Sequence, residues 1–224
     1  IAKEVHWSER AAARIEADYK KIEANLKLPP VPAALLKFLI EECDFDVEHA
    51  DGSFLDHLYY CYEYTVAHYP ERSPLVMLLH SILGTGTNTF AMPASKIPSL
   101  RPLLNDFDWT HIEAFPSILR LLYDLPLRRD LRANAARIDS LKAIHFHRVI
   151  DNKPLTLSAE DFFIQLNYQL IHTVDFLPVS SWARNLRETS FILFRDLHVL
   201  LGVLRRRQAK DDYAPPTGRW RDGD

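Results

Sequence analysis

Glycine and cysteine are scarce in this chain. Of its 224 residues only 6 are glycine while 14 are proline, a balance that disfavours β-sandwiches and glycine-rich phosphate loops. The two cysteines, Cys43 and Cys61, cannot build a disulfide framework, and each lies in an apolar helical context typical of a buried thiol. The fold must therefore rely on a packed core, which a chain of 26.0 kDa is long enough to bury.

Long apolar runs and a strong charge excess are lacking as well. No run approaches the ~20 residues that a helix needs to cross a bilayer, so we expect no membrane span. The formal net charge of -3 and the pI near 6.4 give no reason to expect nucleic acid as a partner. These features favour a soluble intracellular protein, with the compartment left open and an organelle among the alternatives.

Helical periodicity dominates what is present. Apolar residues recur at helical spacing along most of the chain, which predicts an all-α fold. A charged amphipathic helix over residues 3–27, ended by the proline-rich segment after it, would form an N-terminal arm over residues 1–31. Residues 32–208 would form one helical domain and residues 209–224 a C-terminal tail. Within the domain, helices are expected over residues 32–43, 53–68, 75–83, 95–104, 108–123, 128–143, 158–176 and 181–207.

One short region has a different pattern. Apolar and polar residues alternate over residues 145–150 and 154–157, on either side of the turn signal Asp151-Asn152-Lys153. This pattern predicts one small β-hairpin. His145 and His147 would share one side of its first strand.

Histidines gather between residues 49 and 90. His57 lies on a helical face that continues through Cys61, and His80 ends the next apolar helix. Two antiparallel helices joined by a tight link would bring His57 and His80 together, and His49 would enter from the preceding loop. Neutral imidazoles from different elements are what a Zn, Fe or Mn site requires, usually with a carboxylate to complete it. The alternative for each histidine is a hydrogen-bonded core or surface residue.

Further candidates surround these histidines. Asp124 follows an apolar run and is either the acidic ligand or a helix-end residue. Ser81, Thr85 and Thr87 lie beside His80 in a tract that offers hydroxyls and backbone N–H groups to an oxyanion or substrate. The alternative for this tract is a solvated loop, and it does not match a P-loop because no lysine follows.

His172 and Asp175 form a further pair on a later helix. They lie three residues apart, a spacing at which two side chains on a helix are neighbours. The pair either orients a metal-binding residue from behind it through hydrogen bonds or forms a surface hydrogen bond.

The motifs resemble the HD-domain superfamily, whose members are all-α and are mostly metal-dependent phosphohydrolases, with some di-iron oxygenases. Residues 49–58, followed by Leu79-His80-Ser81-Ile82-Leu83-Gly84-Thr85, are similar to a little-characterised HD-like branch, and the similarity extends over about residues 35–180. The resemblance implies a compact HD-like bundle, with His57 as first metal ligand, His80 as the histidine of the His-Asp pair and Asp124 as the closing aspartate. Ser81 stands where that pair has its aspartate, and a neutral hydroxyl is a poor ligand for a hard divalent ion.

Two functions are therefore expected as alternatives. The first is a metal-dependent hydrolase or oxygenase of a small-molecule substrate, with one divalent ion held by His49, His57 and His80, with or without Asp124. The second is a degenerate HD-like domain that serves as a scaffold or accessory subunit. It would dock protein partners through residues 1–28 and through the C-terminal helix and tail. The clustered histidines favour the first function, and the missing aspartate and extended ends favour the second.

Overall fold

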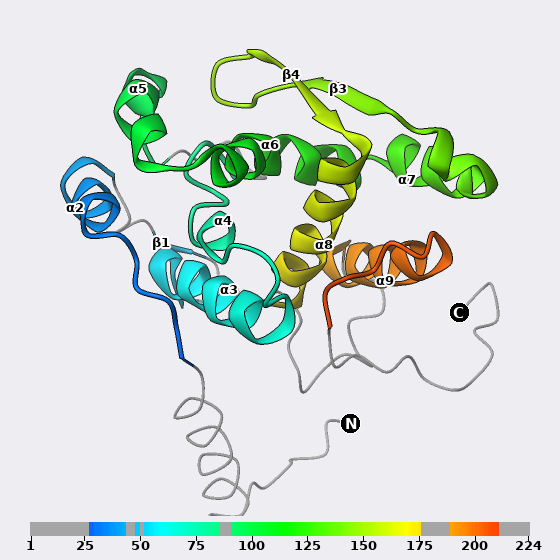
Figure 1. The fold of residues 1–224 in the computed structure, drawn as a ribbon, viewed down its shortest axis with the longest axis horizontal. Coiled ribbons are helices and arrows are strands. Elements are labelled where there is room, and N and C mark those ends of the chain that lie inside the picture. Colours follow the sequence, from blue (N-terminus) through cyan, green and yellow to red (C-terminus); the bar gives the residue numbers. More distant parts are fainter. Residues whose placement is uncertain (1–26, 44–47, 50–51, 86–90, 176–188, 211–224) are drawn as a thin grey trace, which may run out of the picture.

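The computed structural model describes residues 27–43, 48–49, 52–85, 91–175 and 189–210. These residues are mostly helical, which confirms the all-α prediction (Figure 1). The helices are α2 (Ala33–Glu42), α3 (Phe54–His68), α4 (Leu75–Leu78), α5 (Ile97–Leu100), α6 (Asp106–Tyr123), α7 (Leu125–Ala133), α8 (Ala159–Asp175) and α9 (Thr189–Val203), with the 3-10 helices η1 (Ala94–Lys96), η2 (Arg101–Leu103) and η3 (Ala135–Ser140). The expected arm helix, apart from its last residue, and most of the tail lie outside the described residues.

The predicted β-hairpin is confirmed, with its first strand beginning two residues earlier than expected. Strand β3 (Ala143–His147) pairs antiparallel with β4 (Pro154–Ser158). Asn152 lies in the turn between them with φ 58°, a left-handed conformation that asparagine tolerates better than most residues. A second antiparallel pair, β1 (Glu48–His49) with β2 (Gly52–Ser53), leads into α3.

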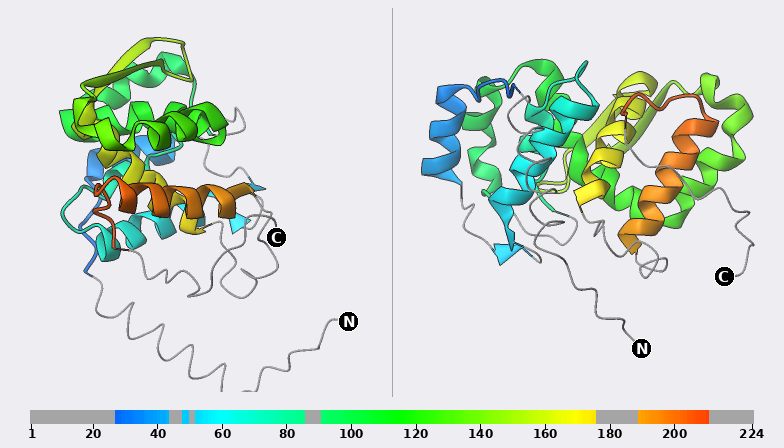
Figure 2. Two further views of the ribbon diagram at one scale, coloured as in Figure 1. Left: turned by 90° about the vertical axis from the view of Figure 1, so that its right-hand side faces the viewer. Right: turned by 90° about the horizontal axis from the view of Figure 1, so that it is seen from below.

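Helix α8 is the central element of the molecule. It packs against α3, α6 and α9 and against the β3–β4 hairpin. In Figure 1 it runs from the end of β4 down past α6 to the side of α3, with α9 beside it. Figure 2 gives two further views of this arrangement. Its apolar side chains Phe162, Leu166 and Leu170 are fully buried, as expected of a helix covered on several sides.

The buried apolar residues form two clusters. One gathers side chains of α6, α7, α8 and α9, and the other gathers those of α2, α3, α4 and α5. Helices α3, α4 and α6 contribute to both: Cys61 and Phe115 belong to the first cluster, and Leu58 and Ile112 to the second. The region around α3 and α4 therefore joins the two halves of the core.

The predicted helix over residues 75–83 is wrong beyond Leu78. The ring of His80 bonds through Nδ1 to the carbonyl of Met77, the oxygen that would accept the N–H of residue 81 in a continuing helix. Successive turns carry the chain on to Gly84, where φ is 134°, a value that L side chains rarely adopt. His80 thus leaves the helix and turns into the interior.

One further helix prediction needs correction. The helix expected over residues 128–143 ends at Ala133, because Asn134 caps it by donating from its amide to the carbonyl of Asp130 at 2.9 Å. A 3-10 helix and β3 follow in its place. Helix α6 contains Pro116 and runs through it from Asp106 to Tyr123.

Within the described part of the chain, no helix combines the length and the apolar character that crossing a bilayer requires.

Candidate functional site

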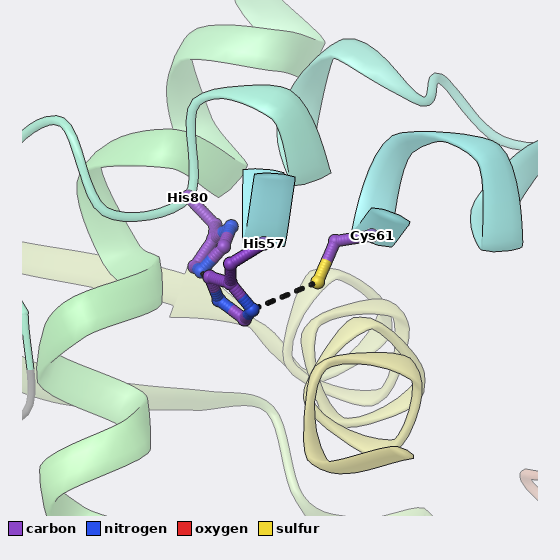
Figure 3. Close-up of side chains that lie close together, drawn as sticks. All are labelled: His57, Cys61 and His80. Atoms are coloured by element: carbon purple, nitrogen blue, oxygen red, sulfur yellow. Dashed lines mark hydrogen bonds between the residues drawn. The ribbon is translucent and has the colours of Figure 1, made fainter. Parts of the chain in front are cut away.

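His57, Cys61 and His80 form a buried group in which one donor atom of each residue lies within 4.8 Å of the others. His57 and Cys61 are one turn apart on α3, and His80 comes from the turn after α4 (Figure 3). Cys61 and His80 have no exposed surface and His57 is 7% exposed. Because these ligand types are those that divalent metals of the zinc class use in proteins, the group could hold a metal ion.

The hydrogen bonds assign a proton to each residue of this group. His80 Nδ1 lies 2.6 Å from the carbonyl oxygen of Met77, which can only accept, so Nδ1 carries the proton and Nε2 presents a lone pair. His57 Nε2, 3.1 Å from His80 Nε2, must then be the donor. His57 Nδ1 accepts from the thiol of Cys61 at 3.9 Å (Figure 3). The protons form one directed chain, from Cys61 through His57 and His80 to Met77.

The spacing of the two imidazoles fits a shared ion. Two nitrogens bound at ~2.0–2.1 Å to a tetrahedral centre lie about 3.3 Å apart, close to the 3.1 Å between the Nε2 atoms of His57 and His80. The bond from His80 Nδ1 to a backbone carbonyl is the contact that usually fixes the tautomer of a metal-binding histidine. To free its Nε2 for an ion, His57 must move its proton to Nδ1, and Cys61 must release its thiol proton to bind as a thiolate.

Aromatic rings enclose the pair on one side. The ring of His172, from α8, lies 4.6 Å from that of His80 and 5.2 Å from that of His57. Phe115, from α6, lies 4.8 Å from His80 and 5.2 Å from His172. Both residues are buried, so the site has a wall that excludes water.

Two members of this environment, Cys61 and His172, were not among the predicted metal ligands. Cys61 is a buried thiol, as predicted, and it also belongs to the buried group that could hold a metal ion. The signal was present in the four-residue spacing from His57 on one helix face. His172 was expected to pair with Asp175, whose side chain lies outside the described residues; the ring of His172 packs against His57 and His80. Only the path of α8 through the fold could have placed it there.

Of the remaining predicted residues, the structure describes Asp124, Ser81 and Thr85. Asp124 is exposed at the junction of α6 and α7 and does not belong to it. Ser81 is buried next to His80, and its carbonyl accepts the N–H of Gly84 at 3.1 Å. Thr85 is half-buried and accepts through its carbonyl from Arg120 at 3.1 Å. Thr87 and the side chain of His49 lie outside the described residues.

A second buried polar group lies between α6 and α8. His111, which has no exposed surface, bonds through Nδ1 to Gln165 Oε1 at 3.0 Å, and its Nε2 lies 3.6 Å from Asp161. Burial lowers the pKa of His111 below 6.5, while the Gln165 bond and the charge of Asp161 act in the opposite direction. His111 is therefore a neutral core histidine, which no sequence motif marked.

Comparison with protein-family models, with curated proteins and with solved structures finds no match for this chain. The resemblance to the HD-like branch accordingly rests on the sequence motifs alone.

Proposed function

We propose that this protein is an HD-like helical domain that holds one divalent metal ion at His57, His80 and Cys61 and serves as a scaffold or accessory subunit. The observation that supports the ion most directly is the 3.1 Å approach of the two Nε2 atoms. It sets two neutral imidazoles from different elements at the separation that one shared ion requires.

Zinc fits this group best among Zn, Fe and Mn. One thiol and two imidazoles are the nitrogen and sulfur ligands that zinc accepts, whereas manganese prefers carboxylate and water oxygens. The group in the described residues contains no carboxylate. Non-haem iron usually pairs two histidines with a carboxylate, which here would have to come from elsewhere.

Two features support the proposed accessory role: the burial of the site and the presence of Ser81. A structural zinc site is closed, and here all three donors and the rings of Phe115 and His172 are buried. Ser81 offers a neutral hydroxyl where an HD hydrolase has a charged ligand able to bridge two ions. An ion in this position would stabilise the junction of the two hydrophobic clusters rather than act on a substrate.

A second candidate function is a metal-dependent hydrolase or oxygenase of a small molecule. The observation that favours it is the number of donors, because three protein ligands and one free position are typical of catalytic zinc. The ion would supply Lewis acidity, and Ser81, Thr85 and Thr87 would orient the substrate beside His80.

Cobalt substitution tests the ion and its ligands together. Full-length protein titrated with Co²⁺ should take up one ion per chain and develop the visible bands of a tetrahedral centre, with a near-ultraviolet band from thiolate ligation. Cys61→Ser should lose the thiolate band, and His80→Ala should lose the visible bands. The matched control is His147→Ala, an exposed histidine on β3. The ligand assignment fails if His147→Ala reduces binding as much as His80→Ala does.

Azide then separates the two functions. A small anion enters a free coordination position and changes the visible spectrum of the cobalt protein, whereas a closed centre leaves the spectrum unchanged. An unchanged spectrum at saturating azide supports the accessory role. A shifted spectrum supports the enzyme and contradicts the closed site.

A further inference from the structure

A pocket is lined by residues of α7, η3, the link to β3, β3 itself and the first turn of α8. Its volume of about 470 Å³ falls in the range typical of small-molecule sites, roughly 300–1,000 Å³. No residue that lines it belongs to the group of His57, Cys61 and His80. The pocket is therefore a separate candidate binding site.

The floor of this pocket is apolar and preformed. Its side chains are buried in the larger hydrophobic cluster or pack against it. They come from four elements and from the link before β3: Leu127, Leu131, Ile138, Leu141, Ile144 and Phe162. Such a floor favours the aliphatic or aromatic part of a ligand.

The rim of the pocket carries two cations and one acid. Arg137 and Lys142 are exposed, and within the described residues neither forms an ion pair. The Arg137 guanidinium donates to the side-chain oxygen of Asn134 at 2.7 Å, which holds it at the mouth. Asp130 is the acid, so the formal charge of the rim is positive. An anionic group on a ligand would meet charge complementarity here.

We propose that this pocket binds a small amphipathic carboxylate, with its hydrocarbon part on the apolar floor and its carboxylate between Arg137 and Lys142. The two parts of the pocket match the two parts of such a ligand. Arg137 can receive a carboxylate through two parallel N–H groups, and Lys142 adds a second charge from the link to β3. The site requires no metal, so the test of this proposal is independent of the metal centre at His57 and His80.

Decanoate is the probe that tests the proposal, by calorimetric titration of the full-length chain. We expect saturable binding of decanoate, and binding of hexanoate weaker by more than about tenfold, because four methylenes fewer reach the floor. Decylamine, which has the same chain and the opposite charge, should bind more weakly than decanoate. Absence of saturable decanoate binding, or equal affinity for decylamine, would overturn the proposal.

Charge variants locate the site. The double variant Arg137→Gln/Lys142→Gln should weaken decanoate binding about fivefold to tenfold, as expected for the loss of two exposed charge contacts. Arg129→Gln, an exposed arginine on α7 outside the lining, is the matched control and should bind as the wild type does. Both variants change exposed side chains, so their melting temperatures should match that of the wild type. Equal affinity of the double variant and the wild type would show that decanoate binds elsewhere.

Discussion

The proton on His57 can occupy either ring nitrogen, and its position separates a metal-free site from a metal-bound one. Without an ion, Nε2 donates to His80 and Nδ1 accepts from Cys61. With an ion at both Nε2 atoms, that proton must move to Nδ1, while His80 keeps its own proton on the Met77 carbonyl. One histidine is thus expected to change tautomer and the other to keep it.

Nitrogen-15 NMR of the ring atoms measures this difference. Addition of Zn²⁺ should convert the His57 spectrum from the Nε2–H to the Nδ1–H form and leave His80 in the Nδ1–H form. A His80 ring that changes tautomer, or a His57 ring that does not respond, contradicts the assignment of these two ligands. His145, which bonds through Nδ1 to Thr156 at 2.9 Å on the hairpin, serves as an internal reference.

His111 predicts a pH dependence of stability. Because burial lowers its pKa in the folded state from 6.5, the unfolded chain binds more protons as pH falls below that value. This residue's share of stability is complete above about pH 6.5 and is lost as pH falls towards the folded pKa. Replacement by glutamine should make the free energy of unfolding less sensitive to acid.

Urea unfolding at about pH 7.5 and about pH 5.5, on either side of the ordinary histidine pKa, checks this expectation. The wild type and the exposed-site variant His145→Gln should lose similar free energy between the two conditions, and His111→Gln should lose less. Equal losses in all three proteins would mean that His111 is not held neutral by the fold.

At the scale of helices and strands, Ser158 illustrates a start signal that the structure bears out. The sequence predicts a helix that begins at Ser158. In the structure the hydroxyl of Ser158 accepts the N–H of Asp161 at 3.0 Å and donates to the Asp161 carboxylate at 2.7 Å. Ser158→Ala should lower stability by about 0.5–2 kcal/mol, the usual cost of losing such a cap. Chemical denaturation of the variant and the wild type measures this loss of stability.

A matched serine provides the control for that prediction. The hydroxyl of Ser140 donates to the Arg137 carbonyl within η3 and caps no α-helix. Ser140→Ala should therefore change stability by less than Ser158→Ala does. Equal effects of the two substitutions would contradict a special role for the α8 cap.

Helix starts and the hairpin could be predicted because their signals are local. Ser158 with its acidic first turn, and Asp151-Asn152-Lys153 between alternating runs, act on neighbouring residues. The ends of α4 and α7 could not be predicted from the sequence. His80 and Asn134 stop these helices through side-chain hydrogen bonds, which the periodicity of apolar residues does not reveal. His57 and His80 were paired from spacing, whereas the approach of His172 depends on the packing of α8.

At the scale of the whole molecule, the metal group lies where the two hydrophobic clusters meet. Helix α3, which packs into both clusters, and the turn after α4, whose apolar residues pack into the smaller one, supply its donors. An ion that binds only the folded chain should therefore stabilise the molecule as one unit, by about 2.7 kcal/mol at a hundredfold excess over its dissociation constant.

Thermal unfolding with and without Zn²⁺ tests this coupling. The wild type should melt at a higher temperature with Zn²⁺ in a single transition. The increase in melting temperature should be smaller for His80→Ala and Cys61→Ser. A zinc effect that survives in His80→Ala would place the ion elsewhere on the molecule.

The metal content of the natively purified protein, measured by mass spectrometry after purification without chelators, tests the central claim most directly. We predict one zinc-class ion per chain in the wild type and in the exposed-site control His147→Ala, and loss of that ion in both His57→Ala and His80→Ala. A wild-type chain that carries no ion and takes up none when Zn²⁺ is supplied would contradict the metal site at His57, His80 and Cys61.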